Sequence, residues 1–179
     1  AILQVIRGAK QQSITVTRGK IPVPSIEASY MIDKNTGYIK LTKFSESSYK
    51  EFMQSMEALQ KQGMQSLVFD LRGNGGGFMN EAVDMADEFL EGDKLIVYTE
   101  GENRKKREYR CKRPGLFEKG KLVLLVDELS ASASEVLAGA LQDWCRATII
   151  GRRTFGKGLV QEQYQLRDGS AMRLTVARY

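Results

Sequence analysis

Residues 129–161 read LSASASEVLAGALQDWCRATIIGRRTFGKGLVQ, and the rest of the chain is organised around this stretch. Three serines alternate with alanines where a helical run begins, and the middle one is Ser132. Lys157 lies in a glycine turn 25 residues after Ser132, and Gln161 follows four residues after Lys157. The chain contains no histidine, so a nucleophilic serine here needs another base, and Lys157 is the candidate.

The composition is that of one folded domain of ordinary size. Of 179 residues, 42% are hydrophobic and 27% are charged, which allows a full core and argues against disorder. Much of the net charge of +5 comes from residues 104–113, a basic run that we interpret as a solvated hairpin or loop. Tyr109 is the only aromatic residue in that run, so we expect no nucleic-acid partner.

Neither the cysteines nor the chain ends indicate the cellular compartment of the protein. Cys111 and Cys145 match no metal-ligand spacing and no redox motif, and two free thiols and one disulfide are both open. No apolar run approaches the length of a membrane span, and there is no signal peptide. Because the chain begins and ends abruptly, we expect it to be an excised piece of a larger protein.

The hydrophobic pattern predicts an α/β fold. Residues 1–19 alternate like a hairpin around Gly8, and residues 21–24, with two prolines, predict an extended linker. Helices are predicted over residues 45–62, 82–90 and 134–144, and strands over 26–32, 37–43, 66–72, 95–99, 121–126, 147–150, 159–164 and 171–177. Helices that alternate with apolar strands indicate a layered sheet with flanking helices.

The strand predicted over residues 66–72 runs into a glycine turn formed by Gly75, Gly76 and Gly77. Three glycines before a helix let the backbone bend sharply and direct its N–H groups at an anion. No lysine follows them as in a phosphate-binding loop, and the dinucleotide fingerprint fails in spacing. We interpret the turn as an oxyanion site; a plain strand-to-helix turn is the alternative.

Ser132 also allows two interpretations. With Glu135 it matches the capping box that closes a helix N-terminus. As a nucleophile, it would gain the free N–H groups of its own helix, which can stabilise a developing negative charge.

Lys157, between two glycines, is either a turn residue that faces water or a general base. A basic lysine must be uncharged, which requires removal from water, and Phe155, Leu159 and Val160 could line such a pocket. Gln161 shares strand parity with Lys157, so its side chain could hold the amine.

Three segments together carry a family resemblance: DLRGNGGG at residues 70–77, SASASE at 130–135 and TFGKGLVQ at 154–161. They resemble, in order and spacing, the signatures of the C-terminal processing peptidases, or tail-specific proteases. The similarity runs from about Ile21 to the end of the chain. It implies a Clp-protease/crotonase-like layered sheet with flanking helices.

The same resemblance implies the roles of individual residues. Ser132 would be the nucleophile, Lys157 the general base, and Gln161 the residue that orients the lysine. The amide of Ala133 and one amide from the Gly75, Gly76 and Gly77 turn would form the oxyanion hole. The resemblance implies neither a metal nor a cofactor.

Members of this family usually carry a PDZ domain before the protease core. Residues 1–20 are therefore expected to be the last strands of such a domain, and residues 21–179 a core truncated at its C-terminal end. We expect reduced activity from such a fragment. The implied partners are C-termini of unfolded or tagged polypeptides, and the implied location is extracytoplasmic, in the periplasm or cell envelope. The resemblance is compatible with a homo-oligomer and with membrane association of the parent protein.

Two other functions use the same fold. A crotonase-type acyl-CoA enzyme would share the glycine turn but would need a carboxylate acid/base, and the pairing of Ser132 with Lys157 argues against it. A non-catalytic binding module is the other alternative, and the intact set of Ser132, Lys157 and Gln161 argues against a degenerate member.

Overall fold

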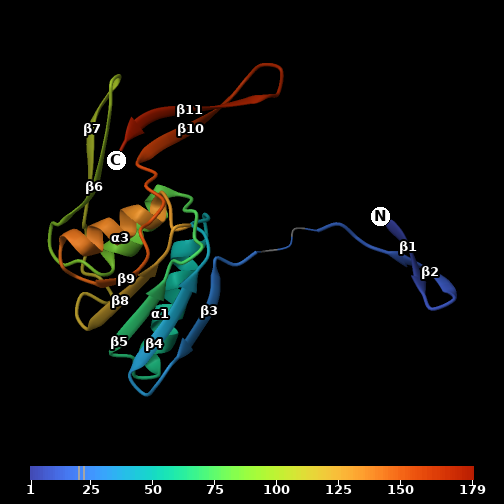
Figure 1. Ribbon diagram of the computed structural model, residues 1–179, viewed down its shortest axis with the longest axis horizontal. Helices are drawn as coiled ribbons and strands as arrows, with labels where there is room; N and C mark the ends of the chain where they lie inside the picture. Colours follow the sequence, from blue (N-terminus) through green and yellow to red (C-terminus); the bar gives the residue numbers. More distant parts are fainter. Residues whose placement is uncertain (20, 22) are drawn as a thin grey trace.

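The structure, a computed structural model, describes residues 1–19, 21 and 23–179 (Figure 1). Its elements in chain order are β1 (Ile2–Arg7), β2 (Lys10–Thr15), β3 (Ile26–Met31), β4 (Thr36–Leu41), α1 (Ser48–Lys61), β5 (Ser66–Asp70), α2 (Met79–Asp87), β6 (Leu95–Gly101), β7 (Arg104–Arg110), β8 (Lys121–Val126), α3 (Ala133–Asp143), β9 (Thr148–Gly151), β10 (Leu159–Gln165) and β11 (Ala171–Arg178).

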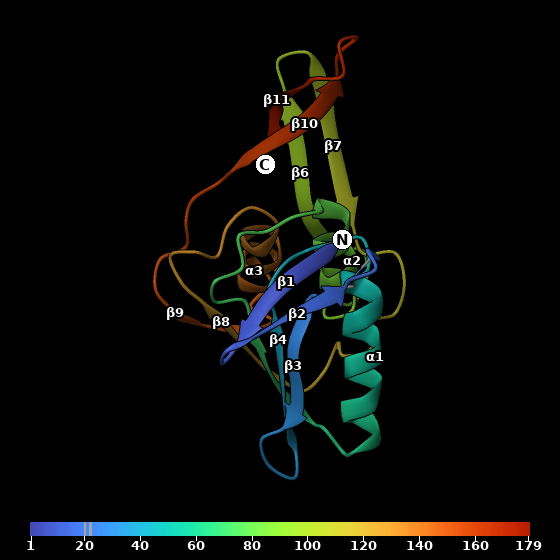
Figure 2. The same ribbon diagram turned by 90° about the vertical axis from the view of Figure 1, so that its right-hand side faces the viewer.

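The central layer is a five-stranded sheet in the order β3-β4-β5-β8-β9. Strands β4, β5, β8 and β9 are parallel, and β3 pairs antiparallel with β4 at one edge. Because the strand order advances in one direction, right-handed crossovers place the connecting helices on one face of the sheet. Accordingly α2 packs against both α1 and α3, and Figure 2 shows α1 running alongside the strands. The predicted α/β layered sheet with flanking helices is confirmed.

A cluster of aromatic rings joins the helices to this sheet. Phe52 of α1 stacks on Phe69 of β5 with ring centroids 5.3 Å apart and meets Phe89 edge-on at 5.7 Å. All three side chains are fully buried, as are Ile39 and Leu41 on the same face of β4. Burial of large apolar side chains is the main favourable term in folding, so this cluster holds β5 firmly and positions the loop that follows it.

A second sheet lies beyond the first in the order β10-β11-β6-β7. It consists of two antiparallel hairpins that are joined where Arg178 of β11 pairs with Glu100 of β6. The basic run predicted as a solvated hairpin or loop is mostly strand β7, with residues 104–108 exposed, so the hairpin interpretation is confirmed. Strands β10 and β7 are the two edge strands of this sheet (Figure 1).

The hairpin predicted at the N-terminus is also confirmed, because β1 and β2 pair antiparallel with each other. Figure 1 shows this hairpin apart from the α/β core. The predicted linker over residues 21–24 and the predicted domain boundary at residue 20 fall partly on residues 20 and 22, which lie outside the described residues.

The bounds of two predicted helices differ from the structure: α2 spans Met79–Asp87 instead of residues 82–90, and α1 starts later than predicted. Helix α1 begins at Ser48 instead of residue 45. The Ser45 N–H donates to Ser48 Oγ at 2.7 Å, so residues 45–47 form a turn that precedes the helix. Serine side chains compete with the helix for backbone partners in this way.

Both cysteines are free thiols; Cys111 is buried and Cys145 is exposed. Burial raises the pKa of the Cys111 thiol to about 11, with Asp87 nearby acting in the same direction. Among the described residues, none of the helices has the length and apolar character that crossing a bilayer would require.

Candidate active site

Three loops that carry the sequence motifs meet at one edge of the central sheet. They follow β5, β8 and β9, which are parallel and lie in the order β5-β8-β9. The carboxyl ends of neighbouring parallel strands open onto the same crevice, which is where α/β folds bind ligands. The topology therefore brings together the glycine turn after β5, Ser132 after β8 and Lys157 after β9.

Ser132 stands at the N-cap of α3 in an unusual backbone conformation, with φ of 57° and ψ of −112°. A non-glycine residue with positive φ costs about 1–3 kcal/mol, and such strain clusters at functional sites. The side chain lines a cavity of about 590 Å³, together with the glycine turn, Lys157 and Gln161.

The two neighbouring serines have different surroundings. Ser130 Oγ donates to the Leu71 carbonyl at 2.8 Å, and Ser134 Oγ donates to the Asn74 carbonyl at 2.9 Å. Both side chains are fully buried, whereas Ser132 is only half-buried. Of the three serines, the structure therefore presents Ser132 to the cavity and uses Ser130 and Ser134 to attach the loops to each other.

The lysine and the glutamine are brought together as predicted, although Lys157 lies in the loop before β10, which begins at Leu159. Lys157 Nζ donates to Gln161 Oε1 at 3.2 Å, and both residues line the cavity that Ser132 lines. Lys157 is half-buried and Gln161 is exposed. Among the described residues, no hydrogen bond joins Ser132 Oγ to Lys157 Nζ.

The apolar surroundings predicted for Lys157 are only partly present. Leu159 lines the cavity. Phe155 does not, because its side chain is 67% exposed to solvent, and Val160 faces away from the cavity because successive strand residues alternate. The predicted contribution of Phe155 and Val160 is therefore wrong for this structure.

The glycine turn touches the serine loop at Gly76. This residue has a φ of +95°, and a Cβ placed on it would lie 2.9 Å from Ser132 Cβ and 3.0 Å from the Ala133 nitrogen. Only glycine fits such a position without displacing its neighbours. The close approach brings the turn beside the first free amide of α3.

Not every amide of the turn is available to an oxyanion. The Gly76 N–H already donates to Asn74 Oδ1 at 2.9 Å. Within the described part of the chain, the N–H groups of Gly75, Gly77 and Ala133 have no protein acceptor. Since Ala133 is the first residue of α3, its N–H is one of the unpaired donors of a helix N-terminus.

Asn74 is a buried side chain that sequence reasoning did not single out. Besides accepting the Gly76 N–H, it donates through Nδ2 to the Leu41 carbonyl at 3.0 Å. Its own carbonyl accepts the Ala131 N–H at 3.0 Å. Asn74 therefore connects β4, the glycine turn and the serine loop, and it determines which amides of the turn stay free.

Glu135 is a second residue whose full role sequence reasoning missed. Its Oε2 accepts the Ser132 N–H at 2.9 Å, which is the capping interaction that the sequence predicts. The same carboxylate also accepts the N–H groups of Gly156 at 2.6 Å and Lys157 at 2.8 Å, and the Thr154 hydroxyl at 2.8 Å. Glu135 thus holds the lysine loop against the serine helix.

The charge state of Glu135 follows from these contacts. Burial alone would raise the pKa of its carboxyl. The hydrogen bonds from Thr154 and from the amides of Gly156, Ser132 and Lys157 outweigh burial and lower the pKa below its ordinary value of 4.5. Glu135 is therefore an acceptor, and not an acid, at neutral pH.

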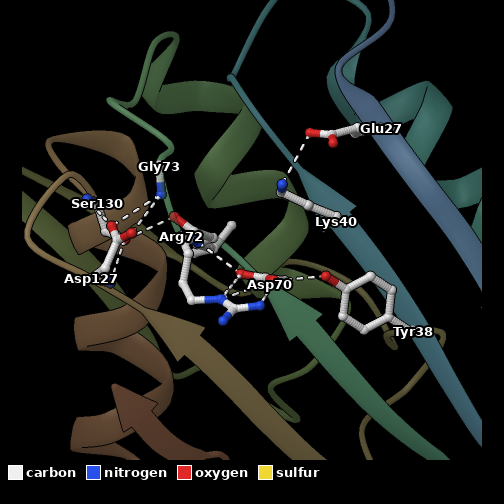
Figure 3. A network of polar contacts seen from close by, with 9 residues as sticks. Glu27, Tyr38, Lys40, Asp70, Arg72, Gly73, Asp127 and Ser130 are labelled. Atoms are coloured by element: carbon white, nitrogen blue, oxygen red, sulfur yellow. Dashed lines mark hydrogen bonds and ion pairs between the residues drawn. The ribbon is translucent and has the colours of Figure 1, made fainter. Parts of the chain in front are cut away.

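A polar network supports the glycine turn from the other side (Figure 3). Arg72 forms an ion pair with the buried Asp70 at 2.6 Å, and the Tyr38 hydroxyl donates to the same carboxylate at 2.7 Å. Burial would raise the pKa of Asp70, but the bonds from Arg72 and Tyr38 lower it. Burial, with Asp70 nearby, raises the pKa of Tyr38 to about 12.

Asp127, after β8, ties this network to the serine loop (Figure 3). Its carboxylate accepts the Gly73 N–H at 3.0 Å, and Ser130 Oγ accepts the Asp127 N–H at 3.0 Å. The turn that carries the candidate oxyanion donors is therefore fixed at both ends.

Comparison with known proteins gives a consistent result. The model of the family "Peptidase family S41" matches residues 35–179. The carboxyl-terminal-processing protease of Synechocystis is 38% identical over 171 residues, which cover 94% of this chain and 40% of that protein. The carboxy-terminal processing protease CtpA of Bacillus subtilis is 37% identical over 172 residues, covering 96% of this chain and 36% of the relative.

A solved structure shows the same fold. The photosystem II D1 C-terminal processing protease superposes with a TM-score of 0.75 at 33% identity and covers 95% of this chain and 47% of its own. The chain thus spans less than half the length of each of these three proteins.

Proposed function

The chain belongs to peptidase family S41, and from this premise we propose that it is the catalytic part of a serine peptidase that cleaves polypeptides near their C-terminus. One observation carries the proposal: a strained serine at a helix N-terminus shares a cavity with a lysine whose amine is held by a glutamine. A serine and an amine base are sufficient for acyl transfer when histidine is absent.

In the proposed reaction, the uncharged Lys157 amine removes the proton from Ser132 Oγ as that oxygen attacks the peptide carbonyl. The carbonyl π bond breaks and its electron pair becomes the oxyanion. The N–H of Ala133, the residue after Ser132, would stabilise this charge together with the N–H of Gly75 or Gly77, because these groups are free among the described residues and both glycines line the cavity that Ser132 lines. The resulting ammonium then protonates the leaving amine as the C–N bond breaks.

The second half of the reaction reverses these roles. Lys157 accepts a proton from water, the hydroxide attacks the ester, and the ammonium returns a proton to Ser132 Oγ as the ester C–O bond breaks. Gln161 acts through the lysine. A neutral amine has one lone pair, and by accepting an amine N–H at 3.2 Å, Gln161 restricts where that lone pair points.

The extracytoplasmic location and the partners expected from the resemblance, polypeptide C-termini, belong to the same proposal. Relatives named as C-terminal processing proteases support the choice of substrate class. Fractionation of the source cells, with cytoplasmic and envelope markers, tests the location.

The test of the reaction uses the full-length protein and an unstructured polypeptide substrate. We expect Ser132→Ala and Lys157→Ala each to lower kcat by about 1,000-fold or more. Ser134→Ala is the matched control, since Ser134 is buried and bonded to the Asn74 carbonyl; it should keep most of the activity. Turnover by Lys157→Ala at a rate near that of the wild type would refute the base assignment.

A further inference from the structure

The cavity at the candidate active site has an unbalanced set of charges. Its lining includes two basic side chains, Lys157 and Arg173, and among the described residues no Asp or Glu side chain lines it. Lys157 already has a place in the proposed reaction. Arg173 has none, although it faces the same cavity from the neighbouring hairpin.

The register of that hairpin explains why Arg173 faces the cavity. In the antiparallel pair of β10 and β11, Gln161 lies opposite Thr175 and Gln163 lies opposite Arg173. Directly opposed residues share a face of a sheet, and residues two apart on one strand share it as well. Arg173 therefore extends the row that begins with Gln161, beside the lysine amine.

The acidic residues of the hairpin are occupied elsewhere. Glu162 alternates to the opposite face, where it pairs with Arg104 at 2.6 Å and accepts the Tyr164 hydroxyl at 2.7 Å. Asp168, in the turn, accepts the Ser170 hydroxyl at 2.6 Å. Among the described residues, the Arg173 guanidinium has no ion pair.

We propose that Arg173 binds the C-terminal carboxylate of the substrate, on the leaving side of the scissile bond. The inference rests on the proposed function and adds a subsite to it. A guanidinium recognises a carboxylate with two parallel hydrogen bonds, and every polypeptide tail ends in that group. Because the proposed reaction uses Lys157 as an uncharged amine, Arg173 is the permanently charged side chain among the described lining residues, and its positive charge favours such an anion over a neutral or basic chain end.

The position of Arg173 also sets a length for the tail. Gln163, opposite Arg173, is two residues along β10 from Gln161, or roughly 7 Å at the rise of a strand. An extended peptide advances by about 3.3 Å per residue, so a carboxylate about two to four residues beyond the scissile bond lies within reach of the guanidinium. Longer tails would carry their carboxylate past it.

The experiment measures kcat/KM of the full-length protein on one peptide series. The peptides share a sequence, release a three-residue tail and end in either a free acid or an amide. For the wild type, we expect amidation to lower kcat/KM by about tenfold or more, as loss of a charge-assisted bond requires. For Arg173→Gln, the acid and the amide should be cleaved equally well.

The control variant is Arg167→Gln, which removes an arginine from the turn of the same hairpin, outside the cavity lining. It should respond to amidation like the wild type. Arg173→Lys keeps the charge and should retain part of the preference for the acid. Thermal melting of each variant separates loss of recognition from loss of folding.

The outcomes discriminate between this subsite and the reaction itself. If the wild type cleaves acid and amide peptides equally, or if Arg173→Gln still prefers the acid tenfold, the subsite is wrong and the peptidase proposal stands. If no peptide is cleaved by the wild type, the proposed function fails first.

Two further peptides test the assignment to the chain end. With a tail lengthened to about eight residues, the difference in kcat/KM between wild type and Arg173→Gln should disappear. Persistence of that difference would contradict the proposed tail length. An amidated peptide with aspartate as its last residue should remain a poor substrate. Its full recovery would overturn the assignment to the terminal carboxylate.

Discussion

The carboxylate of Glu135, in the first turn of α3, accepts the backbone N–H of Lys157 at 2.8 Å. The lysine loop is thereby attached to the helix that begins at Ser132, although the two loops are 25 residues apart in sequence. In the proposed reaction, this contact would affect the rate, because a misplacement of about 1 Å between reacting groups can lower a rate by about 100-fold.

Glu135→Ala should therefore lower kcat by about 100-fold while the protein still folds, because Glu135 positions Lys157 and has no part in proton transfer. Peptidase assays of the full-length protein check the loss of activity, and thermal melting checks that the protein still folds. Glu128→Gln is the control, since Glu128 is exposed and pairs only with Arg152 among the described residues. Activity of Glu135→Ala within a few-fold of the wild type would show that the loop holds its place without the carboxylate.

Asp70 predicts a dependence of stability on pH. Its pKa in the folded protein lies below the ordinary value of 3.8, so its contribution is complete above that value and is lost as pH falls through the lowered one. At pH 7, Asp70→Asn should lower the free energy of unfolding by about 1.5–3 kcal/mol, because Arg72 and Tyr38 lose a charged acceptor.

Denaturant unfolding of wild type and Asp70→Asn between pH 7 and pH 3 measures this effect. The difference between the two proteins should be constant near neutrality and should shrink below about pH 4. Asp143→Asn, on the exposed end of α3, should show neither effect. If the difference in unfolding free energy grew as the pH fell, this would contradict the lowered pKa of Asp70.

Much of the site could be predicted from sequence because each motif is local. The serines, the glycines and the lysine turn lie in short segments that adjoin buried strands, and parallel strands bring such segments to one edge. The prediction that the side chains of Lys157 and Gln161 meet is confirmed, but its premise of a shared strand is not, because β10 begins at Leu159. The predicted capping interaction between Ser132 and Glu135 is present as well.

The rest of the candidate site could not be predicted, because it depends on tertiary contacts that a local sequence pattern does not reveal. Asn74 takes the Gly76 amide only because the turn folds back over it. Glu135 reaches the lysine loop only because β9 pairs beside β8. Phe155 turns into solvent because its backbone N–H bonds to the Ser130 carbonyl at 3.1 Å, which fixes the loop with that side chain outside.

Gly76 predicts a sharp contrast between two adjacent glycines. In Gly76→Ala, the added Cβ meets Ser132 Cβ at 2.9 Å and the Ala133 nitrogen at 3.0 Å, in a backbone with positive φ. We expect a loss of about 1–3 kcal/mol in unfolding free energy and of labelling by a serine-directed covalent probe. Gly75→Ala meets nothing within 4 Å and should unfold like the wild type. Equal stability of the two variants would show that the turn is not packed against Ser132.

Gln161 predicts a shift in the pH–activity profile. A carboxylate in place of the Gln161 amide would lie beside the Lys157 amine and favour its charged form, which cannot act as a base. In Gln161→Glu, the rise of kcat with pH should therefore move to more alkaline values, with activity recovered at high pH.

The matched control for this shift is Gln165→Glu, which places the same charge on β10 four residues away and outside the cavity lining. Its profile should follow the wild type, because exposed charges beyond about 10 Å are largely screened at ordinary ionic strength. A profile of Gln161→Glu that moves to more acidic values, or does not move, would mean that the amine beside Gln161 is not the group whose deprotonation limits the rate. Lys157 would then have to be replaced as the base, while Ser132 would remain the nucleophile to be tested.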